Sequence, residues 1–210
     1  MKFKLNGKPL NIPTSWDEVT YGQYLQMIKL EKDDPAAVIG ILTGIEPAVV
    51  RKAQIVGLEQ ILIAVRLLRT ESPDFSDKVT KVGKYVIPVN GNGEFNIKFE
   101  SLEQFEDMRS VMLKTANNPK SIIESYGEYV AIYLQKFRDG VYDAVKAEAM
   151  IEAEIKAMPA KEVLAAGTFF LVKLLNLLPG TAASSLPTNP PPNKVIGKRS
   201  KKNSKGRTRR

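Results

Sequence analysis

The sequence contains neither cysteine nor histidine among its 210 residues. Without cysteine, the chain can form no disulfide bond, no thiolate zinc site and no cysteine nucleophile. Without histidine, Ser-His-Asp triads, Cys-His pairs and HExxH zinc sites are excluded as well. Catalysis would have to use carboxylate, lysine or tyrosine side chains, and their spacing matches no catalytic motif. We therefore expect a protein that is not an enzyme and that binds no metal or cofactor.

Long apolar segments are equally scarce. Residues 1–13 lack the apolar stretch of about 7 to 15 residues that a signal peptide requires, so we expect no secretion by that route. The best membrane candidate is the segment 163–178, but it spans only sixteen residues and contains Lys173 and Asn176. A lysine near the middle of a bilayer costs about 2.5 to 3.5 kcal/mol, and a spanning helix needs about 20 residues. We expect this segment to form a buried helix and expect no membrane partner.

Acidic residues are absent from the last thirty positions, 181–210, which hold nine of the 31 Lys and Arg residues. The first 180 residues therefore carry 22 basic and 23 acidic side chains and are almost neutral. The C-terminal segment also contains the proline run 190–192 and few apolar residues, so we predict a disordered basic tail. Its cations are the candidate residues for binding nucleic acid or an acidic partner: Lys194, Lys198, Arg199, Lys201, Lys202, Lys205, Arg207, Arg209 and Arg210.

Three interpretations of this tail are open. Its cations could neutralise the phosphates of DNA or RNA, which gives binding that depends on salt but not on base sequence. They could instead contact an acidic protein, or they could have no defined role beyond keeping the chain solvated. No aromatic residue lies in the tail, so it lacks the base stacking that is typical of dedicated single-strand binders.

Two regions show the two-residue period of a β-strand. Residues 3–5 and 10–12 alternate apolar and polar side chains on either side of the turn dipeptide Asn6-Gly7. This pattern predicts a β-hairpin at the N-terminus. A second hairpin is predicted within 78–100, around the turn-rich segment 90–93.

Helix starts are marked by side chains that can cap them. The segments 15–18, 20–23 and 101–104 each place Ser or Thr three residues before Glu or Gln, which is the spacing of a capping box. Asp34-Pro35 is another start signal, and Gly44 follows where that helix would end. Apolar residues at helical spacing follow each of these signals.

Together these patterns predict an α+β fold that is mainly helical. Residues 1–73 are expected to form a small lobe, in which a hairpin precedes short amphipathic helices, one of them starting near Pro47. Residues 74–180 are expected to form a second lobe, in which a hairpin precedes a helical bundle. Residues 181–210 are the predicted disordered tail.

Aromatic and acidic residues at helical spacing are expected to serve structure. Five tyrosines are predicted to pack in the core or between the lobes: Tyr21, Tyr24, Tyr126, Tyr129 and Tyr133. Trp16 is interpreted as a packing anchor at a helix entrance, with an exposed interface residue as the alternative. Glu148 and Glu152 share a helix face, and Lys156 lies four residues after Glu152, so this face is expected to be solvated and stabilised by an ion pair.

Three segments carry a resemblance to a known family. These are IPTSWDEVTYGQYLQMIKL (12–30), AAVIGILTGIEP (36–47) and YDAVKAEAMIEAEIKAMPAKEVLAAGTFFLVKLL (142–175). Together they resemble tail assembly chaperones and related virion-assembly proteins of tailed bacteriophages. The most similar positions are 16–20 with Gln23, 41–44, and the pair Phe169-Phe170.

The resemblance implies a small, helix-rich protein without enzymatic activity that holds the tape measure protein during assembly of the tail tube. Some members of the family carry a C-terminal extension made by frameshifting, and the basic tail is compatible with one. The candidate partner interface is Trp16, Phe169 and Phe170. The expected location is the cytoplasm of the bacterial host or the virion.

Two functions follow as hypotheses. The first is a phage virion-assembly factor or minor structural protein, most specifically a tail assembly chaperone whose helix grooves bind helical partners. The alternative is a nucleic-acid-binding accessory protein that acts through its basic tail.

Overall fold

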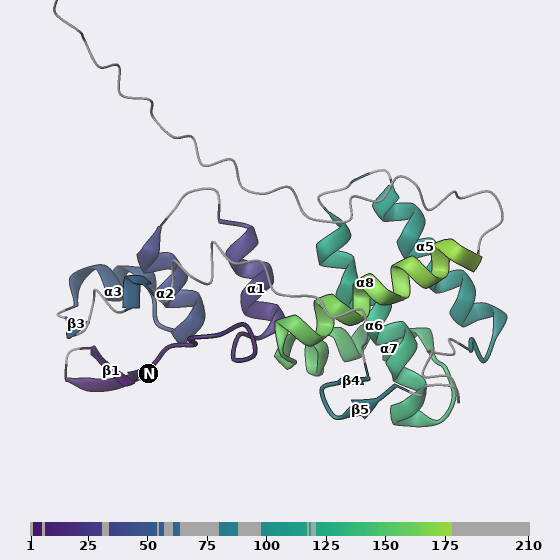
Figure 1. The fold of residues 1–210 in the computed structure, drawn as a ribbon, viewed down its shortest axis with the longest axis horizontal. Helices are drawn as coiled ribbons and strands as arrows, with labels where there is room; N and C mark the ends of the chain where they lie inside the picture. The colour runs from purple at the N-terminus through teal and green to yellow at the C-terminus, as the bar shows by residue number, and fades with distance from the viewer. Residues whose placement is uncertain are drawn as a thin grey trace, which may run out of the picture.

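The computed structural model describes residues 2–5, 7–30, 34–53, 55–56, 61–63, 80–87, 98–116, 118 and 121–177. Within these residues the protein is mainly helical and contains two small antiparallel hairpins (Figure 1). The predicted α+β, mainly helical fold class is therefore confirmed. No helix in this part of the chain is both long enough and apolar enough to cross a membrane.

The N-terminal elements whose bounds the structure describes in full are a hairpin, three short helices and a further strand. They are β1 (Lys2–Leu5), β2 (Lys8–Asn11), α1 (Tyr21–Ile28), α2 (Pro35–Thr43), α3 (Pro47–Lys52) and β3 (Ile55–Val56). The later elements are a second hairpin and a helical bundle. They are β4 (Lys81–Val82), β5 (Tyr85–Val86), α5 (Leu102–Ala116), α6 (Ile122–Asp139), α7 (Ala144–Ala153), the 3-10 helix η2 (Ile155–Ala157) and α8 (Ala160–Leu177).

The first hairpin forms as predicted. β1 and β2 pair antiparallel, with Phe3 opposite Leu10. Gly7 in the turn has a φ of 79°, a conformation that glycine adopts without strain. β3 pairs antiparallel with the other edge of β1, which gives the strand order β2-β1-β3. This strand was not predicted, because a strand of two residues is too short to show alternation.

α1 and α2 begin at predicted caps. The Thr20 Oγ1 accepts a hydrogen bond from the Gln23 N–H (3.2 Å), and the Gln23 Oε1 accepts one from the Thr20 N–H (2.9 Å). Both bonds of this capping box are therefore present. The Asp34 carboxylate accepts hydrogen bonds from two N–H groups in the first turn of α2, and that helix ends at Gly44, which has a φ of 73°.

The capping box predicted at 15–18 is wrong, because these residues form a turn. The Glu18 N–H donates to the Ser15 carbonyl (3.2 Å), and the Glu18 carboxylate accepts from the Thr14 N–H (2.9 Å). A helix that began here would have to continue through Thr20. Thr20 instead has an extended backbone (ψ 155°) and starts α1.

The box predicted at 101–104 starts α5, with one difference. The Ser101 Oγ accepts a hydrogen bond from the Gln104 N–H (3.1 Å), but the Gln104 Oε1 accepts from the Glu100 N–H (3.0 Å) rather than from Ser101. The Gln104 Nε2 also donates to the Ile132 carbonyl of α6 (2.9 Å), and the whole side chain is buried. The cap therefore also fixes α5 against α6.

A second hairpin lies within the predicted region 78–100. β4 and β5 are joined through Gly83 (φ 58°) and Lys84, whereas the predicted turn at 90–93 lies outside the described residues. The Glu154 carboxylate holds this hairpin on the bundle. It accepts a hydrogen bond from the Tyr85 hydroxyl (2.8 Å) and forms an ion pair with Lys84 (3.1 Å).

α6 is the centre of the bundle, with α5, α7 and α8 packed against it (Figure 1). Residues 129–136 are all buried, so this helix is covered on every side. Tyr21, Tyr129 and Tyr133 are almost completely buried, and the other two tyrosines named above pack against the core while partly buried. The predicted structural role of the five tyrosines is therefore confirmed.

α1 joins the N-terminal elements to the bundle, since it packs on α2 and also on α8 and η2. The Tyr21 N–H donates to the Met158 carbonyl (2.8 Å), and the Ala160 N–H donates to the Val19 carbonyl (2.7 Å). These bonds tie the start of α1 to the start of α8. The predicted boundary near residue 73 and the predicted tail 181–210 lie outside the described residues.

Candidate functional site

A groove of about 580 Å³ lies on the helical bundle between α5, α6 and α7. We call it the α5–α7 groove. On each helix its lining residues recur every three or four positions, singly or as adjacent pairs, so each helix presents one face to it. They are Asp107, Ser110, Val111 and Lys114 on α5; Glu124, Glu128, Ala131 and Ile132 on α6; Ala144, Ala147, Glu148, Ile151 and Glu152 on α7; and Tyr21, Leu25, Tyr142 and Lys156 from neighbouring segments.

The floor of the α5–α7 groove is apolar. Val111, Ala131, Ile132 and Ala147 are buried, and Ile151 is partly buried against the same core. α5 and α7 both pack on α6, so these apolar residues lie between two helical walls. Such a surface can be covered by the apolar face of another peptide segment.

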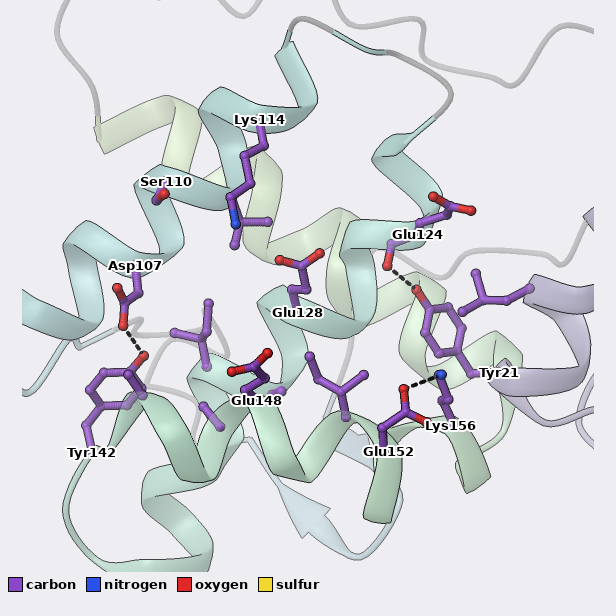
Figure 2. A pocket seen from close by; sticks show the side chains of 17 residues that line it. Tyr21, Asp107, Ser110, Lys114, Glu124, Glu128, Tyr142, Glu148, Glu152 and Lys156 are labelled. Carbon is purple, nitrogen blue, oxygen red and sulfur yellow. Dashed lines mark hydrogen bonds and ion pairs between the residues drawn. The ribbon is translucent and has the colours of Figure 1, made fainter. Parts of the chain in front are cut away.

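The rim of the groove is acidic, because five carboxylates face only two ammonium groups. The carboxylates belong to Asp107, Glu124, Glu128, Glu148 and Glu152, and the ammonium groups to Lys114 and Lys156 (Figure 2). Three of the carboxylates have partners. Glu152 forms an ion pair with Lys156, and Glu124 forms one with Lys29 (3.0 Å). Asp107 accepts a hydrogen bond from the Tyr142 hydroxyl (2.6 Å).

Glu128 and Glu148 are the carboxylates in the middle of the groove, where they extend from α6 and α7 (Figure 2). Burial raises the pKa of the Glu128 carboxyl above its ordinary value; the Lys114 ammonium opposes this rise and the Glu148 carboxylate adds to it. Glu128 is thus partly buried between one ammonium group and a second carboxylate, that of the exposed Glu148. A cation from a partner would gain more here than at a fully exposed site, because the local dielectric constant is lower.

The tyrosines at the two ends of the groove are hydrogen-bond donors. Burial raises the pKa of the Tyr142 hydroxyl, and the hydrogen bond to Asp107 raises it further. Burial also raises the pKa of the Tyr21 hydroxyl. Both hydroxyls are therefore protonated at neutral pH.

In the described part of the chain, no three carboxylates are arranged to hold a metal ion. The groove is suited to binding an apolar segment that carries positive charge.

None of the predicted interface residues lines this groove. Trp16 is partly buried, with its ring edge-on to Tyr24 (5.5 Å between centroids), and Phe169 is partly buried on α8. Phe170 is fully buried and packs on Tyr133 (4.4 Å between centroids), so its assignment to a partner interface is corrected to a core position. Adjacent residues of a helix point about 100° apart, so Phe169 and Phe170 cannot face the core equally.

The structure describes only part of the other predicted sites. The nine cations of the tail lie outside the described residues. Glu148 and Glu152 are exposed as predicted, and the ion pair between Glu152 and Lys156 is present. The sequence did not reveal that this face of α7 is a wall of a groove. The sequence does show small, apolar and acidic residues at helical spacing on one face of 144–152. It does not show that α5 stands opposite this face, because that depends on how α5 and α7 both pack on α6.

Comparisons of this chain with protein-family models, with curated proteins and with solved structures yield no match.

Proposed function

We propose that this protein is a non-enzymatic virion-assembly factor of a tailed bacteriophage, and that it acts as a tail assembly chaperone by holding a helical segment of the tape measure protein in the α5–α7 groove. The observation that carries this proposal is the groove itself, which combines an apolar floor with an acidic rim.

The arrangement of the helices supports a helical client. α5 and α7 both pack on α6, and the groove lies between them. An amphipathic helix laid in this space would complete a four-helix arrangement around the apolar floor. Its apolar residues, at i, i+3, i+4 and i+7, would cover side chains such as Leu25 and Ile151, which line the groove and are only partly buried. The client segment would thereby be shielded from water until assembly replaces the chaperone.

The charge of the groove specifies the client further. Glu128 and Glu148 extend into the middle of the groove, where the Lys114 ammonium opposes the effect of burial on the pKa of Glu128 and the Glu148 carboxylate adds to it (Figure 2). The client segment should therefore carry Lys or Arg beside its apolar stripe. An acidic segment would meet like charges over a partly dehydrated surface, and this repulsion gives the groove its selectivity.

The assignment to phage assembly rests on the resemblance of the segments 12–30, 36–47 and 142–175 to tail assembly chaperones. The last of these segments includes all of α7, which forms one wall of the groove. The part of the sequence that carries the resemblance and the part that builds the binding surface therefore overlap.

The test is co-expression of the full chain with the tape measure protein encoded by the same phage. We expect the client to become soluble and to co-purify with the chaperone. Reversing the central charge with Glu128→Lys and Glu148→Lys should lower the amount of co-purified client by about 10-fold, since each desolvated like-charge contact costs more than 1 kcal/mol.

The matched control reverses two carboxylates that do not line the groove, Glu46→Lys and Glu103→Lys. This variant has the same net charge and should retain the client. Circular dichroism must show that both variants are folded. If the folded, unaltered protein leaves the client insoluble and binds phage DNA tightly instead, the chaperone proposal fails in favour of the nucleic-acid-binding accessory protein.

A further inference from the structure

One part of the chain itself has the composition that complements the α5–α7 groove. Val195 and Ile196 are the only aliphatic branched residues after position 186, and cationic residues flank them: Lys194, Lys198, Arg199, Lys201 and Lys202. An apolar pair between cations matches a groove whose apolar floor lies between carboxylates. No acidic residue of this segment would oppose the rim.

The segment can reach the groove from where the described chain ends. α8 ends at Leu177, and Val195 lies eighteen positions further along. A chain of this length spans up to about 60 Å when fully extended, which is about twice the length of α8 itself, roughly 27 Å. α8 packs against α5, one wall of the groove (Figure 1). The linker is therefore long enough to allow docking within one molecule.

We propose that residues 194–202 dock in the α5–α7 groove of their own chain, with Val195 and Ile196 on the apolar floor and with Lys198 and Arg199 against the carboxylates of Glu128 and Glu148. Tethering makes even a weak contact effective. A linker whose length matches the distance that it must span gives an effective concentration of about 1 mM, so an intrinsic Kd of about 0.1 mM would keep the groove about 90% occupied.

The docked segment would act as a built-in competitor for the groove. A client helix with a longer apolar stripe would displace it, whereas short or weakly basic segments of other proteins would not. This regulatory consequence rests on the proposed function, but the docking itself does not. It can therefore be measured in the absence of any client.

The absence of cysteine allows a direct test on the full chain, because a single introduced cysteine can be labelled without ambiguity. A nitroxide spin label would be attached to Ser200→Cys, and its effect on the backbone amide signals would be measured by NMR. At ~50 mM salt we expect the amides of Glu128, Ile132 and Ala147 to lose about half of their intensity or more, and at ~500 mM salt to recover it, since charge contacts are screened.

Two variants of the labelled chain provide the decisive comparison. Glu128→Gln with Glu148→Gln should abolish the effect, whereas Glu46→Gln with Glu103→Gln, which changes the net charge equally outside the groove, should leave it unchanged. Val195→Asn with Ile196→Asn should also abolish the effect without altering the folded bundle. The proposal is overturned if the groove amides keep their intensity in the unaltered chain, or if both pairs of Gln substitutions have the same effect.

A mixing experiment separates docking within one molecule from docking between copies. Isotope-labelled protein without the spin label would be mixed with spin-labelled protein that carries no isotope. Docking within the chain predicts no loss of signal in the mixture. If the mixture instead loses as much signal as the sample in which one chain carries both labels, the tails are exchanged between two copies, and this replaces the proposal.

Discussion

A single hydroxyl group joins α1 to the centre of the bundle. The Tyr21 hydroxyl lies within 2.7 Å of the Ile123 carbonyl and 3.0 Å of the Glu124 carbonyl, and it accepts a hydrogen bond from the Gly127 N–H (3.0 Å). Tyr21 is completely buried. The ring fits closely because residue 127 is a glycine: a Cβ atom there would lie 2.7 Å from a ring carbon of Tyr21.

Tyr21→Phe should therefore destabilise the protein while keeping its shape. The substitution removes the hydroxyl and leaves buried backbone groups with poorer partners, which costs about 1 to 3 kcal/mol. For a chain of this size, each kcal/mol lowers Tm by about 2 to 4 °C. Urea unfolding followed by circular dichroism would measure the change.

Tyr24→Phe is the control on the same helix, and we expect it to change the free energy of unfolding by less than about 0.5 kcal/mol. Equal losses in the two variants would contradict this account.

At the scale of elements, the crossing of α6 and α8 depends on another close approach. A Cβ atom added to Gly167 would lie 2.4 Å from the Cβ and 2.9 Å from the Cα of Tyr126. These atoms belong to the helix backbone and its first side-chain carbon, so they cannot move aside as the end of a flexible side chain can. The two helices can cross at this distance only because residue 167 has no side chain.

Gly167→Ala tests which of two opposing effects is larger. Helix propensity alone favours alanine by about 1 kcal/mol, which would stabilise the protein. An extra carbon in a packed contact costs about 1 to 3 kcal/mol or more. The cost should be near the upper end here, because the added methyl group would push two helices apart. We expect net destabilisation of about 2 kcal/mol in chemical unfolding. Ala165→Gly, two residues earlier on α8, should cost about 1 kcal/mol, mainly through helix propensity, since the Ala165 methyl group is only partly buried. A more stable Gly167→Ala variant would show that the crossing is looser than described.

The elements also show what local sequence can predict. The starts of α1 and α2 were predictable, because Thr20 and Asp34 bond to backbone groups within three residues of themselves. The box at 15–18 failed because the Glu18 N–H bonds to the Ser15 carbonyl and the Glu18 carboxylate bonds to the Thr14 N–H, which closes a turn instead of starting a helix. β3 has no local signal, since two residues join a sheet only because β1 offers an unpaired edge.

The candidate site was less predictable than the elements. The acidic face of α7 and the spacing of its residues are visible in the sequence, and its solvent exposure was predicted. Which helices stand opposite depends on α5 and α7 both packing on α6, and on α1 closing one end with Tyr21 and Leu25. The contact of α1 joins residues more than 100 positions apart, since the Gly127 N–H donates to the Tyr21 hydroxyl, whereas α5, α6 and α7 follow one another along the chain. No periodicity in a single segment encodes them.

At the scale of the whole molecule, the chain joins an acidic groove to a strongly basic C-terminal segment. The nine cations after position 180 face no acidic residue in that segment. If all nine contact phosphates, the logarithm of the DNA-binding constant should fall with the logarithm of salt concentration with a slope of about −8. The same cations cannot contact the groove and DNA at once. Docking in the groove should therefore weaken DNA binding, and loss of docking should strengthen it.

We expect the full chain to bind duplex DNA of any base sequence with this steep dependence on salt, measured by fluorescence anisotropy.

If the groove holds the segment for about 90% of the time, only about a tenth of the molecules are free to bind, and the apparent affinity is lowered about 10-fold. Glu128→Gln with Glu148→Gln should then raise the affinity at low salt by up to about 10-fold over the control Glu46→Gln with Glu103→Gln, which has the same net charge. At high salt the two variants should converge, because the contact with the groove is screened together with the contacts to phosphate. Equal affinities at every salt concentration would mean that the cations are free in the unbound protein, and a slope near zero would mean that they do not bind DNA.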